Sequence, residues 1–356
     1  MKVTILHIIE SLVIGGAEVL LTESLKGVSD DYRHVVVYMR PPETLLPEVK
    51  AAKLYCLNYT GKYSLLSCAC KLREIIKAEQ VKLIHAHHYW PIIVARLAKP
   101  ANIQLITTIH GLLSKDAFQP NRLSLYLEKL TYSKKHHMVF VSETVAQDYR
   151  KYIKTGSNCS VVYNFVKDEF YLPEYCSSAK ENSEGFRFVT VGTLKSAKNH
   201  TFLLEAFKLL KGENIYLDII GDGPLMDELQ KNIDENSLEK VKLKGEHQKV
   251  NELLHQYDGF ILASAHEGFG IAMVEAMAVG LPCVLSDIDA HREVTANHAL
   301  FFDLDLPEDC AKKILELKNN AELRNKLALS GKARAQKFKR GIYLQQIDAL
   351  YKHYLT

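Results

Sequence analysis

The chain has 356 residues, of which 47% are hydrophobic and 24% are charged. This composition is ordinary for a globular protein that buries a sizeable core, and at roughly 150 residues per domain the length predicts two domains. The formal net charge of +3 is too small to indicate nucleic acid as the main partner, so none is expected.

The first residues, MKVTILHIIESLVIGGAE, resemble a signal peptide only superficially. Their apolar run is short and is interrupted by Glu10, and no small-residue cleavage site follows, so they are better interpreted as a first strand. No run approaches the ~18 apolar residues that a membrane-spanning helix needs. The seven cysteines are scattered and lie mostly inside apolar segments, so we expect reduced thiols and a cytoplasmic protein.

The first half of the chain alternates between short strand-like runs and helical stretches. The runs are near-continuously apolar, as expected of parallel strands that are covered on both faces. This alternation is typical of βαβ units and predicts an open, doubly wound sheet. The predicted strands are VTILHII, HVVVYMR, KLIHAHH, IQLITTIH, HMVFVS and SVVYNF, and the predicted helices cover residues 17–25, 65–78 and 124–132.

A polar segment then interrupts the alternation, and a second alternating series runs from FRFVTVG to ALFF. We therefore predict an α/β protein with one domain over residues 1–166, a linker over 167–186 and a second domain over 187–338. Residues 339–356 have apolar positions three and four apart, and they are a candidate helix for packing back on the first domain. Two doubly wound domains would face a central cleft, with ligands beyond the carboxyl ends of the strands.

Glycines mark two of the strand-to-helix turns. Gly15 and Gly16 follow the first strand, where glycine lets a ligand approach the backbone and the next helix offers free N–H groups. A tight turn of the kind that every α/β domain needs explains them equally well, and G-x-G-x-x-G is absent. Gly221 and Gly223, in IIGDGPL, precede Pro224 in an expected first helical turn, which we interpret as structural.

Two lysines, Lys195 and Lys198, lie in the turn that opens the second domain, just before a helix expected from about His200. Two cations at a helix N-terminus oppose the helix dipole, and an anion bound between them would relieve the repulsion. Taken alone, this turn is explained more simply by two solvated lysines.

The stretch AHEGFGIAMVEAMAVGLP holds two glutamates. Glu267 lies in a Gly-rich turn just past a strand, and Glu275 lies in the second turn of a helix expected from about Gly270. Side chains of a helix lean toward its N-terminus, so the two carboxylates are expected to line one ligand. The first N–H groups of this helix would be free to bind an anion, and Glu275 would need donors such as hydroxyls. Structural pairing of both carboxylates is the alternative.

Glu267 and Glu275 at this spacing, followed by AMAVGLPCVLSD, resemble the signature of the retaining glycosyltransferases of family 4. The resemblance extends, in order, through IGGAE, VSE, VVYNFV, VGTLKSAKN, IIGDGPL and GEHQKVNELLHQYDGFILAS, and so it covers nearly the whole chain. It implies the GT-B fold, in which two Rossmann-like domains face a central cleft.

The resemblance implies a role for each matching residue. Glu267 would contact hydroxyls of the donor sugar, Lys198 would neutralise the diphosphate, and His110 would lie beside the transferred sugar; these three are the expected catalytic residues. The family often has arginine where Thr193 stands, and Lys195 is the candidate to supply the missing charge. The expected substrate-binding residues, which include backbone donors, the ribose-binding glutamate and a loop beside the base, are Gly15, Gly16, Thr193, Lys195, Gly245, Glu246, His247, Gly268, Phe269, Gly270, Ile271 and Glu275.

Two clusters resemble metal sites, and we expect a metal at neither. Asp303 and Asp305 form an Asp-x-Asp pair, but a helix follows, so Asp305 is expected to cap it. His85 and His87 share one face of a predicted strand, yet no carboxylate or cysteine lies near them in the sequence.

Basic and aromatic residues gather in three stretches of the first domain, YSLLSCACKLREIIKAE, YSKKHH and YRKYIK. They fit docking to an anionic lipid that carries the acceptor, and they fit an ordinary solvated surface equally well. Peripheral association with the inner face of the plasma membrane is therefore kept as a hypothesis.

The sequence thus predicts a retaining, metal-independent glycosyltransferase that moves a hexose-type sugar from a nucleotide-diphosphate sugar to a hydroxyl acceptor. The nucleotide sugar is a substrate, and no cofactor is expected. The resemblance fits the assembly of a cell-surface polysaccharide, such as capsule or lipopolysaccharide, on a lipid-linked or saccharide acceptor. Two alternatives keep the same fold: a sugar-nucleotide epimerase and an inactive sugar-nucleotide-binding module.

Overall fold

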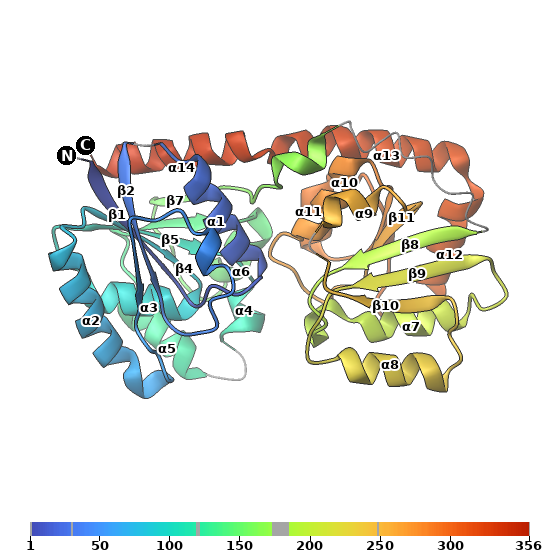
Figure 1. Ribbon diagram of the computed structural model, residues 1–356, viewed down its shortest axis with the longest axis horizontal. Helices are drawn as coiled ribbons and strands as arrows, with labels where there is room; N and C mark the ends of the chain where they lie inside the picture. The colour runs from blue at the N-terminus through green and yellow to red at the C-terminus, as the bar shows by residue number, and fades with distance from the viewer. Residues whose placement is uncertain (1, 30, 119–121, 173–184, 248, 356) are drawn as a thin grey trace. The chain divides into compact units, whose positions relative to one another are not determined.

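The computed structural model describes residues 2–29, 31–118, 122–172, 185–247 and 249–355 (Figure 1). The chain forms two compact units, of which the first contains residues 1–165 and 340–356 and the second contains residues 166–339. In each unit, helices cover a sheet made only of parallel strands (Figure 1). The predicted linker lies largely outside the described residues.

The first unit is built on a seven-stranded sheet with the strand order β3-β2-β1-β4-β5-β6-β7. The order reverses between β1 and β4, so a crevice is expected at the carboxyl ends of these two strands. Residues of β1 such as Ile5 and Ile8 are fully buried, as the apolar run predicts. The strands are β1 (Val3–Ile9), β2 (Tyr32–Tyr38), β3 (Lys53–Cys56), β4 (Leu83–His87), β5 (Gln104–Ile109), β6 (His137–Phe140) and β7 (Cys159–Val161).

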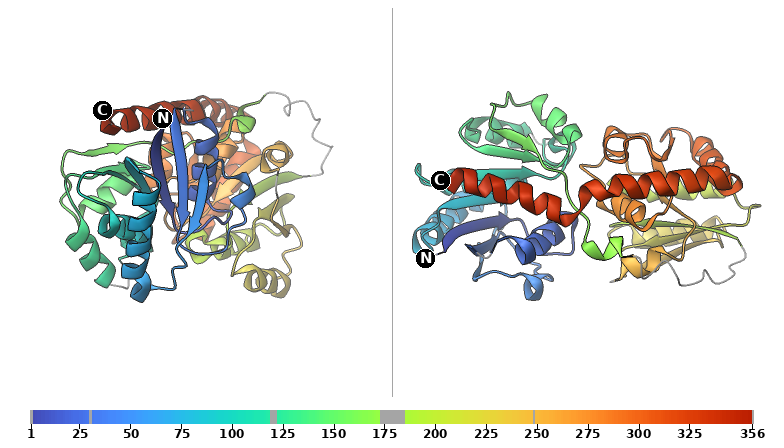
Figure 2. Two further views of the ribbon diagram at one scale, coloured as in Figure 1. Left: turned by 60° about the vertical axis from the view of Figure 1, so that its left-hand side comes forward. Right: turned by 90° about the horizontal axis from the view of Figure 1, so that it is seen from above.

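Helices of the first unit follow the predicted periodicity. The helix expected over residues 65–78 is confirmed as α2, whose buried positions recur three and four residues apart. The last helix lies along the first sheet (Figure 2), where Tyr351 is buried and meets His85 of β4. The helices are α1 (Gly16–Gly27), α2 (Leu65–Ala78), α3 (Tyr89–Ala98), α4 (Leu113–Asp116), α5 (Arg122–Thr131), α6 (Glu143–Arg150) and α14 (Arg340–Leu355), with 3-10 turns η1 (Leu46–Glu48) and η2 (Lys62–Ser64).

The second unit has a six-stranded sheet with the order β10-β9-β8-β11-β12-β13, which reverses between β8 and β11. The predicted pair of doubly wound domains is therefore confirmed. The strands are β8 (Phe186–Val191), β9 (Ile215–Ile220), β10 (Val241–Gly245), β11 (Gly259–Leu262), β12 (Cys283–Ser286) and β13 (Leu300–Phe302). The helices are α7 (His200–Lys208), α8 (Met226–Glu235), α9 (Val250–Leu254), α10 (Ile271–Val279), α11 (Asp289–Thr295), α12 (Pro307–Asn319) and α13 (Ala321–Ala335), with 3-10 turns η3 (Asp168–Tyr171), η5 (Ser196–Lys198) and η6 (Gln336–Phe338).

Two expected helix starts are wrong. Pro224 lies before α8 rather than in its first turn, because the N–H of Met226 bonds to the carbonyl of Gly223 and closes a turn that has Pro224 at its second position. Asp305 does not cap α12, whose N-cap is Leu306 and has no side-chain bond. The backbone N–H of Asp305 instead donates to the carboxylate of Asp303, 2.9 Å away. This bond stabilises the turn that contains both aspartates.

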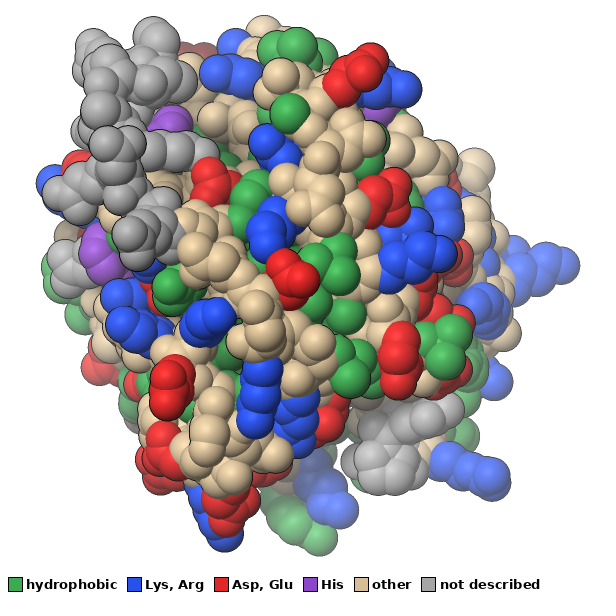
Figure 3. Space-filling view, turned by 90° about the vertical axis from the view of Figure 1, so that its right-hand side faces the viewer, with side chains coloured by type: hydrophobic (Ala, Val, Ile, Leu, Met, Phe, Trp, Pro, Cys, Tyr) green, Lys and Arg blue, Asp and Glu red, His purple; other side chains and the backbone are tan. Residues whose placement is uncertain are grey.

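The described cysteines, Cys56, Cys68, Cys70, Cys159, Cys283 and Cys310, are all free. Among the described residues, no helix combines the length and the apolar character that crossing a bilayer requires. Figure 3 shows a face of the molecule on which acidic and basic side chains are interspersed, so no single charge dominates there.

Candidate active site

Lys198 and Glu267 meet at the carboxyl edge of the second sheet, where the strand order reverses. Lys198 ends η5, which follows β8, and Glu267 follows β11. The ammonium of Lys198 forms an ion pair with Oε1 of Glu267, and the hydroxyl of Ser264 donates to the same oxygen at 2.8 Å. Burial raises the pKa of Glu267, but the charges of Lys198 and His291 and the hydrogen bonds from Lys198 and Ser264 together outweigh it, so the pKa is lowered. Glu267 is therefore ionised at neutral pH.

A second layer of buried polar groups holds this segment. The hydroxyl of Ser286, at the end of β12, donates to the carbonyl of Ser264 at 2.7 Å. His291 of α11 lies with Nδ1 2.9 Å from the carbonyl of Ser286, so Nδ1 carries the proton and donates. The backbone N–H of Ala265 also bonds to the carbonyl of Ala197 in η5. Sequence reasoning missed Ser264, Ser286 and His291, although polar residues at the ends of buried strands were the available signal.

The N-terminus of α10 is open to an anion. Its N-cap, Gly270, has a φ of 82°, a left-handed conformation that favours glycine. No side chain caps the helix and its first turn has no acidic residue, so the N–H groups of Ile271 and Ala272 have no acceptor in the described chain. Phe269 buries its ring against Phe338, so its side chain is not exposed to a ligand. Together with the helix dipole, these donors suit a phosphate group.

Glu275 lies in the second turn of α10, as predicted. Burial is the main cause that raises its pKa to about 7. The charge of Lys167 lowers this pKa, and the charge of Glu169 in η3 raises it. No hydrogen bond to its carboxylate is formed within the described residues. A carboxyl group in this state can accept from ligand hydroxyls, which is the role that the resemblance implies.

The loop after β8 is shaped by close backbone contacts. Gly221 and Gly223 have φ values of 142° and 158°, and a Cβ at Gly221 would lie 2.0 Å from the carbonyl oxygen of Gly192. Larger residues would therefore push apart the loops that follow β8 and β9, which supports the structural interpretation of IIGDGPL. Thr193 and Lys195 are exposed in this loop, and Lys195 forms no ion pair with a described residue.

The loop expected beside the base follows β10. Gly245 has a φ of 69° and open space where a Cβ would lie, and its carbonyl accepts from the N–H of Gly221 at 2.8 Å. Glu246 and His247 are both exposed beyond it. This loop is thus tied to the loop after β9, and its side chains are available to a ligand.

In the first unit, the expected phosphate turn faces a carboxylate. Gly15 is the N-cap of α1 and Gly16 its first residue, and a Cβ at Gly15 would lie 2.5 Å from Oε2 of Glu18. Glu18 also pairs with His88 at 3.3 Å. Burial lowers the pKa of His88, but the hydrogen bond to Glu18 and the charges of Glu18, Glu10 and Asp116 together have a larger effect. The pKa of His88 is therefore raised above its usual value. A phosphate at this helix end would have to share it with the Glu18 carboxylate.

His110, the expected neighbour of the transferred sugar, directly follows β5. Its Nε2 lies 3.2 Å from Nδ1 of His87, whereas its own Nδ1 is buried and has no partner among the described residues. Burial holds the pKa of His110 well below its usual value, so the ring is neutral. A neutral imidazole with one unused nitrogen can accept or donate one hydrogen bond to a ligand.

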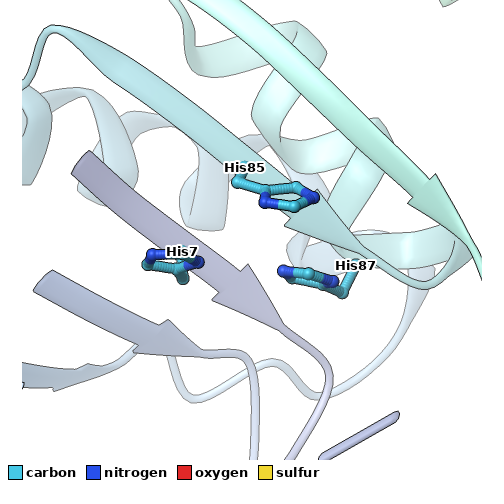
Figure 4. A group of neighbouring side chains, drawn as sticks. All are labelled: His7, His85 and His87. Atoms are coloured by element: carbon cyan, nitrogen blue, oxygen red, sulfur yellow. The ribbon is translucent and has the colours of Figure 1, made fainter. Parts of the chain in front are cut away.

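His7, His85 and His87 form the one group in the described chain whose ligand atoms lie close enough for a shared metal ion (Figure 4). The sequence interpretation had missed His7. However, Nδ1 of His85 bonds to Tyr351 and its Nε2 bonds to Thr108, both at 2.7 Å. The rings of His85 and His87 also lie close together, with centroids 4.2 Å apart (Figure 4). The arrangement fits a buried hydrogen-bonded row better than a ligand set.

Comparison with known families agrees with this geometry. Residues 14–170 match the model described as Glycosyltransferase Family 4, and residues 174–334 match the model described as Glycosyl transferases group 1. The two models together span most of the chain. The chain therefore belongs to the family 4, or group 1, glycosyltransferases.

Relatives and solved structures agree over long stretches. An uncharacterized glycosyltransferase of Methanocaldococcus jannaschii is 26% identical over 91% of each chain. The UDP-Gal:alpha-D-GlcNAc-diphosphoundecaprenol alpha-1,3-galactosyltransferase of Escherichia coli is 28% identical over 64% of this chain and 63% of its own. The Anabaena protein HepE, solved with UDP and glucose, superposes with a TM-score of 0.84 at 21% identity, covering 98% of this chain and 99% of that one. The GT-B fold is thereby confirmed.

Proposed function

We propose that this glycosyltransferase moves a hexose-type sugar, with retention of configuration, from a nucleotide-diphosphate sugar to a hydroxyl of a lipid-linked or saccharide acceptor. The observation that carries the proposal is the edge of the second sheet, where Lys198, Glu267 and the uncapped start of α10 lie on loops of one unit. The complexes of HepE with UDP and the activity in the name of the E. coli relative support a nucleotide-sugar donor.

The difficult step is departure of the diphosphate from the anomeric carbon. As the bond between that carbon and the phosphate oxygen breaks, negative charge grows on the diphosphate. Lys198, which keeps further N–H donors beside its bond to Glu267, and the free N–H groups of α10 would stabilise this charge. The acceptor oxygen attacks the same face of the sugar, and the leaving phosphate takes the acceptor proton.

Glu267 and Glu275 would bind hydroxyls rather than act as nucleophiles. Glu267 is ionised and held by two partners, so it is a fixed acceptor for sugar hydroxyls. Glu275 has no hydrogen-bond partner among the described residues, and it would accept from the ribose hydroxyls. We propose that no metal takes part, because the cation and the helix end supply the positive potential that the leaving group needs.

Nucleotide release separates this proposal from its alternatives. With a panel of nucleotide sugars, a transferase releases nucleoside diphosphate faster when a saccharide acceptor is added, an epimerase releases it without an acceptor, and a binding module releases none. NMR of the product then reports the anomeric configuration. A product of inverted configuration, or release that ignores the acceptor, would contradict the proposal.

We further propose that the first unit docks on anionic membranes through α5. Its side chains Leu123, Tyr126 and Leu130 are exposed at positions three and four apart, and Tyr126 and Leu130 are more than 60% exposed. Arg122 and Lys129 are exposed on the same helix. An apolar stripe beside cations is the pattern that binds anionic bilayer surfaces.

The basic patch on α2 is smaller than the sequence suggested. The guanidinium of Arg73 donates to the carbonyls of Ala98 and Leu97 at 3.0 and 3.1 Å, so it closes the end of α3. Lys71 likewise donates to the carbonyl of Leu57 at 3.4 Å. The membrane proposal therefore relies on α5.

Vesicle co-sedimentation tests the membrane proposal. Wild-type protein should sediment with phosphatidylglycerol vesicles and less with phosphatidylcholine vesicles, and Tyr126→Ser with Leu130→Ser should reduce sedimentation. Leu329→Ser is the matched control, because Leu329 is 72% exposed on α13 of the second unit. Equal binding by wild type and the α5 variant would overturn the proposal.

A further inference from the structure

A chain of buried hydrogen bonds leads from α11 to the carboxylate of Glu267. It begins at His291, whose Nδ1 lies 2.9 Å from the carbonyl oxygen of Ser286 and 3.2 Å from its hydroxyl. The hydroxyl of Ser286 lies 2.7 Å from the carbonyl oxygen of Ser264, and the hydroxyl of Ser264 lies 2.8 Å from Oε1 of Glu267. The three residues that lead to Glu267 are fully buried, so bulk water does not compete for these bonds.

The chemistry of the partners fixes the direction of each bond. An ionised carboxylate and a backbone carbonyl can only accept, so the hydroxyl of Ser264 donates to Glu267 and the hydroxyl of Ser286 donates to Ser264. Nδ1 of His291 therefore carries the proton that Ser286 accepts. Burial is the main cause that lowers the pKa of His291, although the charge of Glu267 and the bond to Ser286 act to raise it, and so the ring is neutral.

Only one of the two ring nitrogens of His291 is used within the described chain. Nε2 is buried and has no hydrogen-bond partner there. A buried polar atom in this state destabilises a fold, and a leucine, which has a similar size, would avoid that cost. What leucine cannot supply is the N–H donor that Nδ1 offers to Ser286. The donor, and not the packing, is therefore what a histidine adds at this position.

Glu267 has two partners with different roles. Lys198 and Ser264 both bind Oε1, and Oε2 forms no hydrogen bond with the described residues, so Oε2 is left for a hydroxyl of the donor sugar. Lys198 also has to serve the leaving diphosphate in the proposed reaction. Ser264 has no second role of this kind, so it is the partner that holds the carboxylate in place while the donor is bound.

We propose that His291 is a positioning residue for donor-sugar recognition. It holds Ser286, and through Ser286 and Ser264 it directs the free oxygen of Glu267 toward the sugar. His291 is itself fully buried, so it acts through Glu267 and not by contact with the substrate. A recognition group works only when its neighbours lock its geometry to within a fraction of an ångström. The inference rests on the proposed sugar transfer and deepens it by naming the residue that orients the sugar-binding carboxylate.

Two substitutions of His291 provide the test. Asparagine places an N–H donor where Nδ1 of histidine lies, whereas leucine removes the donor and keeps the bulk. Each protein is titrated calorimetrically with UDP, GDP, ADP and dTDP, and then with glucose, galactose, mannose and N-acetylglucosamine conjugates of the nucleotide that binds. His291→Leu should weaken the preferred conjugate about ten-fold, as for one lost hydrogen bond to a charged group, and change diphosphate affinity by less than about two-fold. His291→Asn should keep both affinities near wild type.

Ser286→Ala interrupts the same chain and leaves His291 in place. It should reproduce the sugar-specific loss, and in both interrupted variants kcat should fall at least about ten-fold, because a misplaced group no longer orients the sugar. His298→Gln, a change of an exposed histidine in the same unit, is the control. Wild-type binding of the conjugate by either interrupted variant, an equal loss of diphosphate and conjugate, or an asparagine variant as weak as the leucine variant would overturn the inference.

A double-mutant cycle tests whether His291 acts through Glu267. In a Glu267→Gln background, His291→Leu should weaken the conjugate by no more than about two-fold further, because the group that it positions is already altered. Two full and additive losses would contradict the inference. A wild type that binds neither diphosphates nor conjugates defeats the proposed function and this inference with it. Diphosphate binding that depends on Lys198, with conjugate binding indifferent to His291, defeats this inference alone.

Discussion

Lys198 is the cation on which the proposed stabilisation of the leaving diphosphate depends. Lys198→Ala removes a charge from a partly buried site and should raise the barrier by about 3–4 kcal/mol, as for the loss of one oxyanion donor. Steady-state kinetics should therefore show kcat reduced by about 10²–10³. Lys211→Ala, an exposed lysine of the same unit, is the control. A Lys198→Ala enzyme with near wild-type kcat would contradict this role.

Lys195 is the candidate replacement for the arginine that the family often has at position 193. Its exposure and its lack of an ion pair in the described chain make it free to bind a phosphate or to remain solvated. Binding to the leaving group predicts that Lys195→Ala lowers kcat at least ten-fold. A change within about a factor of two, as for ordinary surface substitutions, would leave Lys198 and α10 as the phosphate ligands.

Glu275 couples function to stability through its raised pKa. Its pKa is about 7 in the folded protein against 4.5 for the free group, so the folded state binds more protons between these pH values and stability falls as pH rises through this window. At pH 8 the cost is up to about 3 kcal/mol, because each pKa unit corresponds to 1.36 kcal/mol. Glu275→Gln should therefore raise the free energy of unfolding at pH 8 and leave it nearly unchanged at pH 4.

The same substitution should weaken binding of a nucleotide sugar, because an amide accepts the ribose hydroxyls less strongly than a carboxylate does. Denaturant unfolding at the two pH values and donor titration at pH 8 measure both effects. Equal free energies of unfolding of wild type and variant at pH 8 would show that burial does not raise the pKa of Glu275.

At the residue scale, sequence reasoning proposed Glu267, Glu275 and Lys198 as site residues because each stands in a recognisable turn or helix, and the structure pairs Lys198 with Glu267. It could not identify Ser264 and His291 as neighbours of Glu267. Their contacts run between adjacent strand ends, and a linear pattern does not reveal which strand ends adjoin.

At the scale of elements, strongly periodic segments were the most predictable. The helix over residues 65–78 was predicted with its exact bounds, since five buried positions repeat at helical spacing. The start of α8 was wrong because Pro224 suits both a helix N-terminus and the second position of a turn. Only the bond from Met226 to Gly223 decides between these two structures.

The strands of the first sheet and the loop after β5 carry a group of neutral histidines. Burial is the first cause that lowers the pKa of each: His34 to about 4, His85 to about 3, and His7, His87 and His110 well below the usual value. Below pH 6.5 the unfolded chain therefore binds protons that the folded first unit does not, so stability falls as pH falls.

Thermal unfolding between pH 7.5 and 5 should show this loss, at about 1 kcal/mol per pH unit for each such histidine. His34→Gln should reduce the slope of the free energy of unfolding against pH, because about one proton fewer is bound on unfolding. His298→Gln, an exposed histidine of the second unit, should not change it. A melting temperature that is independent of pH over this range would contradict the account of these neutral histidines.

At the scale of the whole molecule, the resemblance and the alternation of strands and helices predicted two doubly wound domains, and both sheets have this topology. The expected central cleft concerns the placement of the two units and stays a prediction. The groups that we assign to the leaving diphosphate, Lys198 and the start of α10, both belong to the second unit.

Independence from metal is a property of the complete reaction. Because we assign the leaving-group charge to Lys198 and α10, turnover should be unchanged after dialysis against EDTA. Metal content of the purified protein should show no stoichiometric zinc at His7, His85 and His87. Loss of turnover in EDTA that manganese or magnesium restores would overturn this assignment.

The most direct test of the central claim is calorimetric titration of the wild-type protein and of Lys198→Ala with UDP, GDP, ADP and dTDP. Our account predicts that at least one diphosphate binds the wild type with one site per chain. It also predicts that its affinity falls at least ten-fold in Lys198→Ala, while Lys211→Ala keeps it. Binding that is indifferent to Lys198, or no binding of any nucleoside diphosphate, would contradict the claim that this edge of the second sheet holds the leaving group.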